Sequence, residues 1–113
     1  MHALKITATG WLQKITVDPT RIADEIGCTE VQSAQLHHNV SLWFDTNHTC
    51  MWREPNMSAV CLMLNVGDHH PDTAPIPCGD VILLGAAADG TPADLHRHQY
   101  EALAHALLNS LAA

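Results

Sequence analysis

Hydrophobic and polar residues alternate along the start of the chain, with the period of two that is typical of β-strands. Leu4 and Ile6 fall on one face of a first strand, and Gly10 offers the positive φ that suits a tight Thr-Gly turn. Ile15 and Val17 continue the apolar face on the return strand. This part of the sequence therefore predicts a β-hairpin with one buried face.

A short helix is predicted next, at residues 18–28, because both of its ends carry the usual signals. Asp18 is a favourable N-cap, Pro19 suits the first helical position, and Gly27 suits the position just past the end. Isoleucines spaced four residues apart between these ends form a buried stripe.

The middle of the chain predicts further strands and a second helix. Residues 30–38 and 39–45 form two strands, and a short strand is expected around Cys50–Trp52. Residues 57–65 are strongly apolar and predict a short helix. The stripe expected to face its core consists of Met57, Val60, Cys61 and Leu64.

The last part of the chain predicts a central strand and the longest helix. Residues 80–85 are the most hydrophobic segment, which is typical of a strand covered on both faces. A helix is expected over residues 91–113, because Thr91 and Asp94 match a capping box. Its expected core positions are Tyr100, Leu103, Leu107 and Leu111.

Together these elements predict a single α+β domain over residues 1–113. The sheet is expected to be mixed but mostly antiparallel, with about five to six strands. Three helices accompany it, and the C-terminal helix is the longest. A hydrophobic content of 47% supports a folded globule.

The charge of the chain excludes two classes of partner. The formal net charge is −7, and the segment 66–113 has six acidic residues against the single base Arg97. Nucleic-acid phosphates and anionic membranes repel such a surface, so neither is expected to bind directly. No apolar run approaches the length of a membrane span, and the N-terminus lacks the pattern of a signal peptide. A cytoplasmic protein with four cysteine thiols is therefore expected.

Five short stretches resemble a known bacterial and phage family. They are "MHALKI", "RIADEIGC", "VSLWFDTNH", "EPNMSAV" and "GDVILLGAAADG". In this order they resemble the domain-of-unknown-function family 3846 (DUF3846), which occurs in actinobacteria, other Gram-positive bacteria, phages and mobile elements. The resemblance spans nearly the whole chain and implies a small protein carried by a phage or mobile element. It implies no activity, because none is established for the family.

Histidines and acidic residues provide the candidate metal ligands. The loop "NVGDHHPDTAPIPCGD" contains His69 and His70, and His98 and Glu101 share one face of the last helix. Each segment also has an interpretation without a metal. Adjacent histidines project in different directions, so the loop can be an extended polar connection. The face of the last helix can be an ordinary solvated surface.

Two tryptophans are candidates for protein contact. Trp43 lies opposite the apolar face of its strand, and Trp52 lies in the next predicted strand. An exposed tryptophan is a favoured interface anchor, whereas a covering helix or a dimer partner would give the same pattern.

No catalytic motif or phosphate-binding loop is present in the sequence, so neither an enzyme nor a cofactor is expected. The leading hypothesis is a small protein that acts by binding a host protein, as an adaptor or inhibitor that could counter host defence; a homodimer is compatible with the sequence. Two alternatives remain. One is a metal-binding module or metal-dependent enzyme, and the other is a nucleic-acid mimic that blocks a DNA-binding enzyme.

Overall fold

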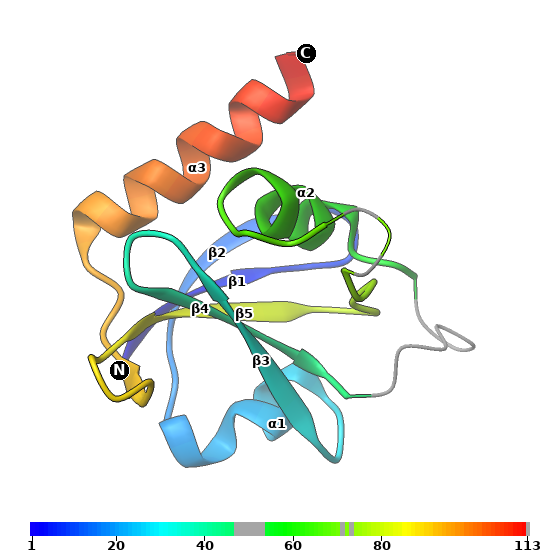
Figure 1. Cartoon of the computed structure of the whole chain (residues 1–113). Coiled ribbons are helices and arrows are strands. Elements are labelled where there is room, and N and C mark those ends of the chain that lie inside the picture. Colours follow the sequence, from blue (N-terminus) through cyan, green and yellow to red (C-terminus); the bar gives the residue numbers. More distant parts are fainter. Residues whose placement is uncertain (47–53, 71, 73, 113) are drawn as a thin grey trace.

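The chain folds into three layers, with one sheet between helices on its two faces (Figure 1). The structure is a computed structural model that describes residues 1–46, 54–70, 72 and 74–112, with the side chains of residues 110–112 outside the description. Its strands are β1 (His2–Ile6), β2 (Leu12–Thr16), β3 (Val31–Leu36), β4 (Val40–Asp45), β5 (Val81–Ala86) and β6 (Pro92–Ala93). Its helices are the short 3-10 helix η1 (Pro19–Arg21), then α1 (Ile22–Ile26), α2 (Met57–Asn65) and α3 (Arg97–Ala112).

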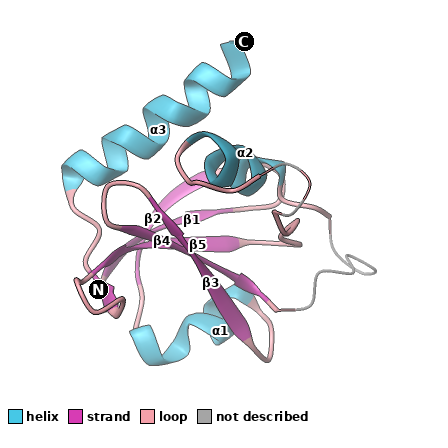
Figure 2. Cartoon of the chain, in the orientation of Figure 1, coloured by secondary structure: helices cyan, strands magenta, loops and turns pink. Residues whose placement is uncertain are grey.

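The sheet has six strands in the order β2-β1-β5-β4-β3, with β6 paired to β5, and every pair is antiparallel. Figure 2 shows α2 and α3 on one face of this sheet and α1 on the other. The predicted α+β class is confirmed, and so is the prediction that the last helix is the longest.

Strand β5 supplies core residues to both faces, as its continuous apolar sequence predicts. Val81 and Leu83 pack in the cluster beneath α2 and α3, and Ile82 and Leu84 pack in the cluster beside α1. All four side chains are completely buried. The ends of the first helical segment also follow the sequence, because the side chain of Asp18 accepts the Thr20 amide hydrogen.

The first hairpin differs from the sequence-based expectation in its register. Its turn contains three residues, since the Thr7 amide donates to the Trp11 carbonyl at 3.0 Å. A two-residue turn would have set Ile15 opposite Leu4, but Leu4 lies opposite Lys14. Shifting the register by one residue moves every side chain of the return strand to the other face. The prediction that Ile15 and Val17 share the face of Leu4 and Ile6 is therefore wrong, and both pack toward α1.

Helix α2 buries a different face from the one expected. Ala59, Leu62 and Met63 are its buried residues, whereas the side chain of Met57 is 57% exposed. The buried set has the spacing of three and four residues that one helix face requires. Apolar residues occur around most of this helix, so periodicity alone did not identify the buried side.

Helix α3 begins six residues later than predicted. The segment before it forms β6, in which Ala93 pairs with Gly85, and Thr91 bonds the Asp89 carboxylate instead of capping a helix. Asp94 accepts the amide hydrogen of His2 at 2.7 Å, so it does not serve in a capping box. Pairing with the edge of β5 outweighed the local helix signal.

The cysteines also differ from the expectation of four thiols. Cys28 and Cys61 are thiols, but Cys78 is disulfide-bonded. The thiol prediction is therefore wrong for Cys78, which is 1% exposed. The strand predicted around Cys50–Trp52 lies outside the described residues.

Candidate functional site

Two pockets lie one after the other between the edge strand β2 and helix α3. We call this pair of pockets the β2–α3 groove. Its apolar pocket, of about 290 Å³, is lined by Gly10, Leu12, Met57, Ser58, Cys61, Ala104, Leu107 and Leu108. Its cationic pocket, of about 240 Å³, is lined by His2, Ala3, Lys14, Ile15, Leu95, Arg97 and Tyr100.

The register of the β1–β2 hairpin determines which side chains of β2 line the groove. Residues directly opposite each other in an antiparallel pair share a face, and Leu12 and Lys14 lie opposite Ile6 and Leu4. Ile6 and Leu4 belong to the core cluster beneath α3, so Leu12 and Lys14 rise beside that helix. One strand thus gives the groove an apolar side chain and a cation two residues apart.

The apolar pocket gathers exposed hydrophobic side chains. Five large hydrophobic residues of the described part are exposed, namely Trp11, Leu12, Met57, Ile76 and Leu108. Three of them, Leu12, Met57 and Leu108, line this one pocket, with exposed fractions of 38%, 57% and 65%. Single exposed hydrophobic residues are ordinary on protein surfaces, whereas three of them around one pocket make this pocket a candidate binding surface.

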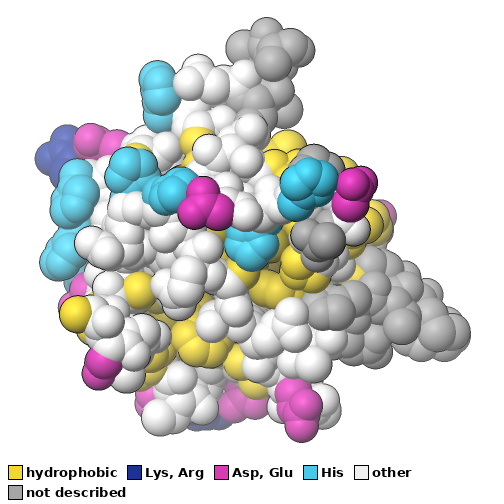
Figure 3. Space-filling view, in the orientation of Figure 1, with side chains coloured by type: hydrophobic (Ala, Val, Ile, Leu, Met, Phe, Trp, Pro, Cys, Tyr) yellow, Lys and Arg dark blue, Asp and Glu magenta, His cyan; other side chains and the backbone are white. Residues whose placement is uncertain are grey.

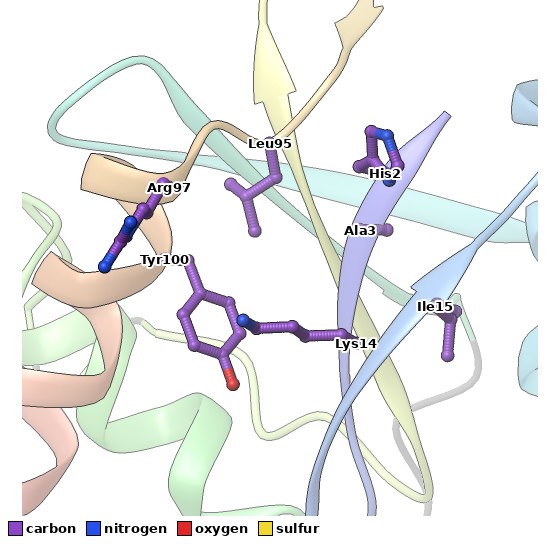
Figure 4. Close-up of a pocket in the computed structure, with 7 residues that line it drawn as sticks. All are labelled: His2, Ala3, Lys14, Ile15, Leu95, Arg97 and Tyr100. Atoms are coloured by element: carbon purple, nitrogen blue, oxygen red, sulfur yellow. The ribbon is translucent and has the colours of Figure 1, made fainter.

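The cationic pocket is shown in Figure 4, where the side chain of Lys14 reaches from β2 toward the ring of Tyr100 on α3. The Lys14 ammonium lies 4.5 Å from the centre of that ring, a distance that permits a cation–π interaction. Arg97 lines the same pocket at the start of α3, and its Nε atom lies 3.0 Å from the Glu101 carboxylate. In a chain of net charge −7, this pocket collects two of the five Lys and Arg residues.

Lys14 differs from the other described cations in its partners. Lys5, Arg21 and Arg97 each lie within 4.0 Å of a carboxylate oxygen, at 3.4, 3.1 and 3.0 Å. Over the described ranges of the chain, the Lys14 ammonium makes no such ion pair and contacts an aromatic ring instead. Asp94 accepts the amide hydrogen of the pocket residue His2, and this hydrogen bond lowers the pKa of the Asp94 carboxyl group.

The outer edge of β2 carries backbone groups that point away from the sheet. Hydrogen bonds at the two ends of the hairpin join Thr7 to Trp11 and Val17 to Met1. Antiparallel strands alternate between bonded and non-bonded pairs, so the N–H and C=O groups of Leu12, Lys14 and Thr16 face outward. The residues whose side chains enter the groove are therefore also those with outward backbone groups.

The structure does not bring the candidate metal ligands together. His70 lies beside Asp72, His98 stacks on His96, and Glu101 pairs with Arg97. Figure 3 shows the histidines of the displayed face spread in a loose band rather than gathered at one point. Throughout the described ranges, no three His, Cys, Asp or Glu side chains form a group that could hold a metal ion.

His69 lines a surface pocket together with His37 and Asp68. In that pocket His37 Nε2 and Asp68 Oδ1 are 3.2 Å apart. This pair is exposed and joins the end of the β3 strand to the loop that follows α2, which is a structural contact between two loops.

Among the described residues the exposed tryptophan is Trp11, which is not one of the two singled out in the sequence. Trp43 is partly buried against the cluster beside α1, and its indole N–H donates to the Ser41 hydroxyl at 2.9 Å. Trp43 thus fits the alternative in which a helix covers its face of the sheet. Trp52 lies outside the described residues. Trp11 is 71% exposed and directly precedes Leu12 at the end of the groove.

Comparisons with protein-family models, with curated proteins and with solved structures found no match to the chain. The resemblance to DUF3846 therefore stays an expectation from the sequence. None of the helices in the described part of the chain is both long enough and apolar enough to cross a membrane.

Proposed function

We propose that this protein acts without catalysis, by binding another protein through the β2–α3 groove. The observation that carries the proposal is the concentration of Leu12, Met57 and Leu108 around one pocket. Exposed hydrophobic groups of this kind lose contact with water when a partner covers them, which is the main favourable contribution to protein association.

The composition of the groove supports a protein partner. Protein interfaces combine an apolar centre with a polar rim and are enriched in methionine, aromatic residues and arginine. The groove has Met57 and Leu108 at one end and Tyr100 and Arg97 at the other. Its walls come from an edge strand and two helices, so a partner contacts several elements at once.

The sequence resemblance supports one class of partner. A protein carried by a phage or mobile element encounters the proteins of its host, so the partner in this proposal is a host protein. An adaptor or an inhibitor of host defence would both use such a surface. The chain would then need no cofactor, since its effect comes from occupying a surface of the partner.

The proposal is tested by capturing partners from a host lysate with matched variants. Met57→Glu and Leu108→Glu place a carboxylate in the apolar pocket, and both side chains are exposed enough to leave the fold intact. Ile76→Glu is the control, because Ile76 is 50% exposed and does not line the groove. Partners are identified by mass spectrometry, and the main one is then purified and titrated against each variant.

We expect the wild type and the Ile76 variant to bind the same purified partner, and the two groove variants to bind it at least about tenfold more weakly. A partner that binds all four proteins equally would show that the groove is not the binding surface. Absence of any partner that survives purification would contradict the proposed function itself.

A further inference from the structure

The edge of β2 offers a partner more than hydrophobic contact. The strand has β1 on one side, and the described part of the chain places no strand on its other side. The outward backbone groups of Leu12, Lys14 and Thr16 are therefore available to another strand. Open edges of this kind take up extended segments of other chains, and the main-chain hydrogen bonds then provide affinity.

The groove beside this edge would contact every second side chain of such a segment. Side chains directly opposite each other across two strands lie close enough to interact. A residue placed opposite Leu12 would lie at the apolar pocket, beside Met57 and Leu108. A residue placed opposite Lys14 would lie next to the Lys14 side chain, at the cationic pocket.

The charges around Lys14 indicate which type of side chain the partner would place opposite it. The Lys14 ammonium is without a carboxylate partner among the described residues, although the whole chain has net charge −7. Two carboxylates contact residues of this pocket, and both are already engaged, Glu101 by Arg97 and Asp94 by the His2 amide. An acidic side chain opposite Lys14 would supply the missing charge.

A second copy of this chain fits the same edge poorly. If two β2 strands paired antiparallel and used all three outward residues, Lys14 of one copy would face Lys14 of the other. Like charges directly opposite each other destabilise a strand pair. The occupant is therefore a different polypeptide.

We propose that the partner binds as an extended segment that adds to β2 as an antiparallel strand, with an acidic residue opposite Lys14 and an apolar residue opposite Leu12. In the partner's own direction the motif is acidic-x-apolar. This inference rests on the proposed function and specifies which part of the partner is recognised. Backbone pairing supplies affinity, and the two pockets supply selectivity.

A synthetic peptide provides the test. A blocked peptide with the core Thr-Val-Glu-Val-Leu places Thr, Glu and Leu opposite Thr16, Lys14 and Leu12. It is titrated to about 1 mM into the isotopically labelled protein while amide shifts are followed by NMR. We expect saturable shifts along β2 and the facing side of α3. N-methylation of the peptide's Glu nitrogen should weaken binding about tenfold, because it removes a hydrogen bond to β2.

A charge exchange makes the test specific for Lys14. Lys14→Glu should weaken binding of the Glu peptide about tenfold and should favour a peptide with Lys at the central position. The side chain of Gln13 points to the other face of β2, so Gln13→Glu introduces a carboxylate on that face as a control and should leave the preference for the Glu peptide unchanged.

Three results would overturn the inference: no binding at about 1 mM, equal binding of the N-methylated peptide, or association of the protein with itself through β2. If the peptide fails but Met57→Glu still abolishes partner capture, the groove binds a partner in another form and only the strand addition is wrong. If both tests fail, the proposed function falls as well.

Discussion

Asp94 is a single residue that joins the start of the sheet to the approach of the last helix. Its carboxylate accepts the amide hydrogen of His2, a residue of the cationic pocket, at 2.7 Å. This hydrogen bond is the main cause that lowers the pKa of Asp94 from its ordinary value of 3.8. The charged form is thus favoured in the folded chain, and the contact helps to hold α3 beside β1.

The stability conferred by Asp94 should depend on pH. Because its pKa is lowered in the folded state, its contribution is present above the ordinary value of 3.8 and is lost as the pH falls through the folded pKa. We expect Asp94→Asn to be less stable than the wild type at neutral pH, and the difference to shrink in acid. Urea unfolding across the acidic range measures both effects.

Asp72→Asn serves as the control for the loss of one negative charge, because Asp72 lies on an exposed loop. The Asp94 prediction is contradicted if the stability difference between the wild type and Asp94→Asn stays constant as the pH falls below 3.8.

At the scale of the elements, the close approach between β5 and the segment that follows β6 depends on Gly85. A Cβ atom at Gly85 would meet the backbone carbonyl of Asp94, which is fixed by the pairing of Gly85 with Ala93. Gly27 presents the opposite case, since a Cβ there meets nothing within 4 Å but the backbone has φ of 84°. The first glycine is required by space, and the second by backbone conformation.

Replacing these glycines should therefore have unequal costs. We expect Gly85→Ala to lower the free energy of unfolding by about 2–3 kcal/mol, because backbone cannot move aside as a flexible side chain can. Gly27→Ala should cost about 1 kcal/mol, from the left-handed conformation alone. Chemical unfolding of both variants measures the difference, and equal costs would argue against the close approach at Gly85.

The positions of the elements could be predicted from the sequence better than the faces they bury. The hairpin, α2 and β5 occur where the apolar runs and turn residues predict them, because those signals are local. The side chains that form the groove were missed, because their direction depends on details that are not local. One additional turn residue places Lys14 beside α3, and tertiary packing turns Met57 outward.

The histidine pattern did not predict a metal site correctly, for a related reason. Histidines are frequent along the chain, but a metal site needs ligands that the fold brings together, which residue spacing within one loop or helix does not show. The structure instead spreads the described histidines among β1, separate loops and α3. If a three-residue turn had been considered for the first hairpin as well as a two-residue turn, the sequence would have predicted that Leu12 and Lys14 share the face of Leu4 and Ile6.

The molecule as a whole is acidic, and this raises the alternative of nucleic-acid mimicry. Six acidic residues lie in the segment 66–113, but the strongest candidate surface is an apolar groove with cations at one end. A mimic would bind a basic cleft through many charge pairs, whereas the groove would use hydrophobic contact and one main pair. Salt screens the first mode far more strongly than the second.

The two modes predict different responses of partner binding to salt. We expect the affinity for the purified partner to fall less than about tenfold between 50 mM and 500 mM NaCl, since one main charge pair contributes. A nucleic-acid mimic that makes many charge contacts would lose about a thousandfold or more. Titration by calorimetry at several salt concentrations separates these outcomes, and the steep loss would favour mimicry over the groove.

The most direct measurement is the footprint of the bound partner on this chain, by hydrogen–deuterium exchange with and without saturating partner. The predicted result is protection in β2, in the first turn of α2 and along the groove-facing part of α3, with α1 unchanged. Protection confined to α1 and β3, or to the histidine loop at residues 67–70, with β2 unaffected, would contradict the assignment of the groove as the binding surface.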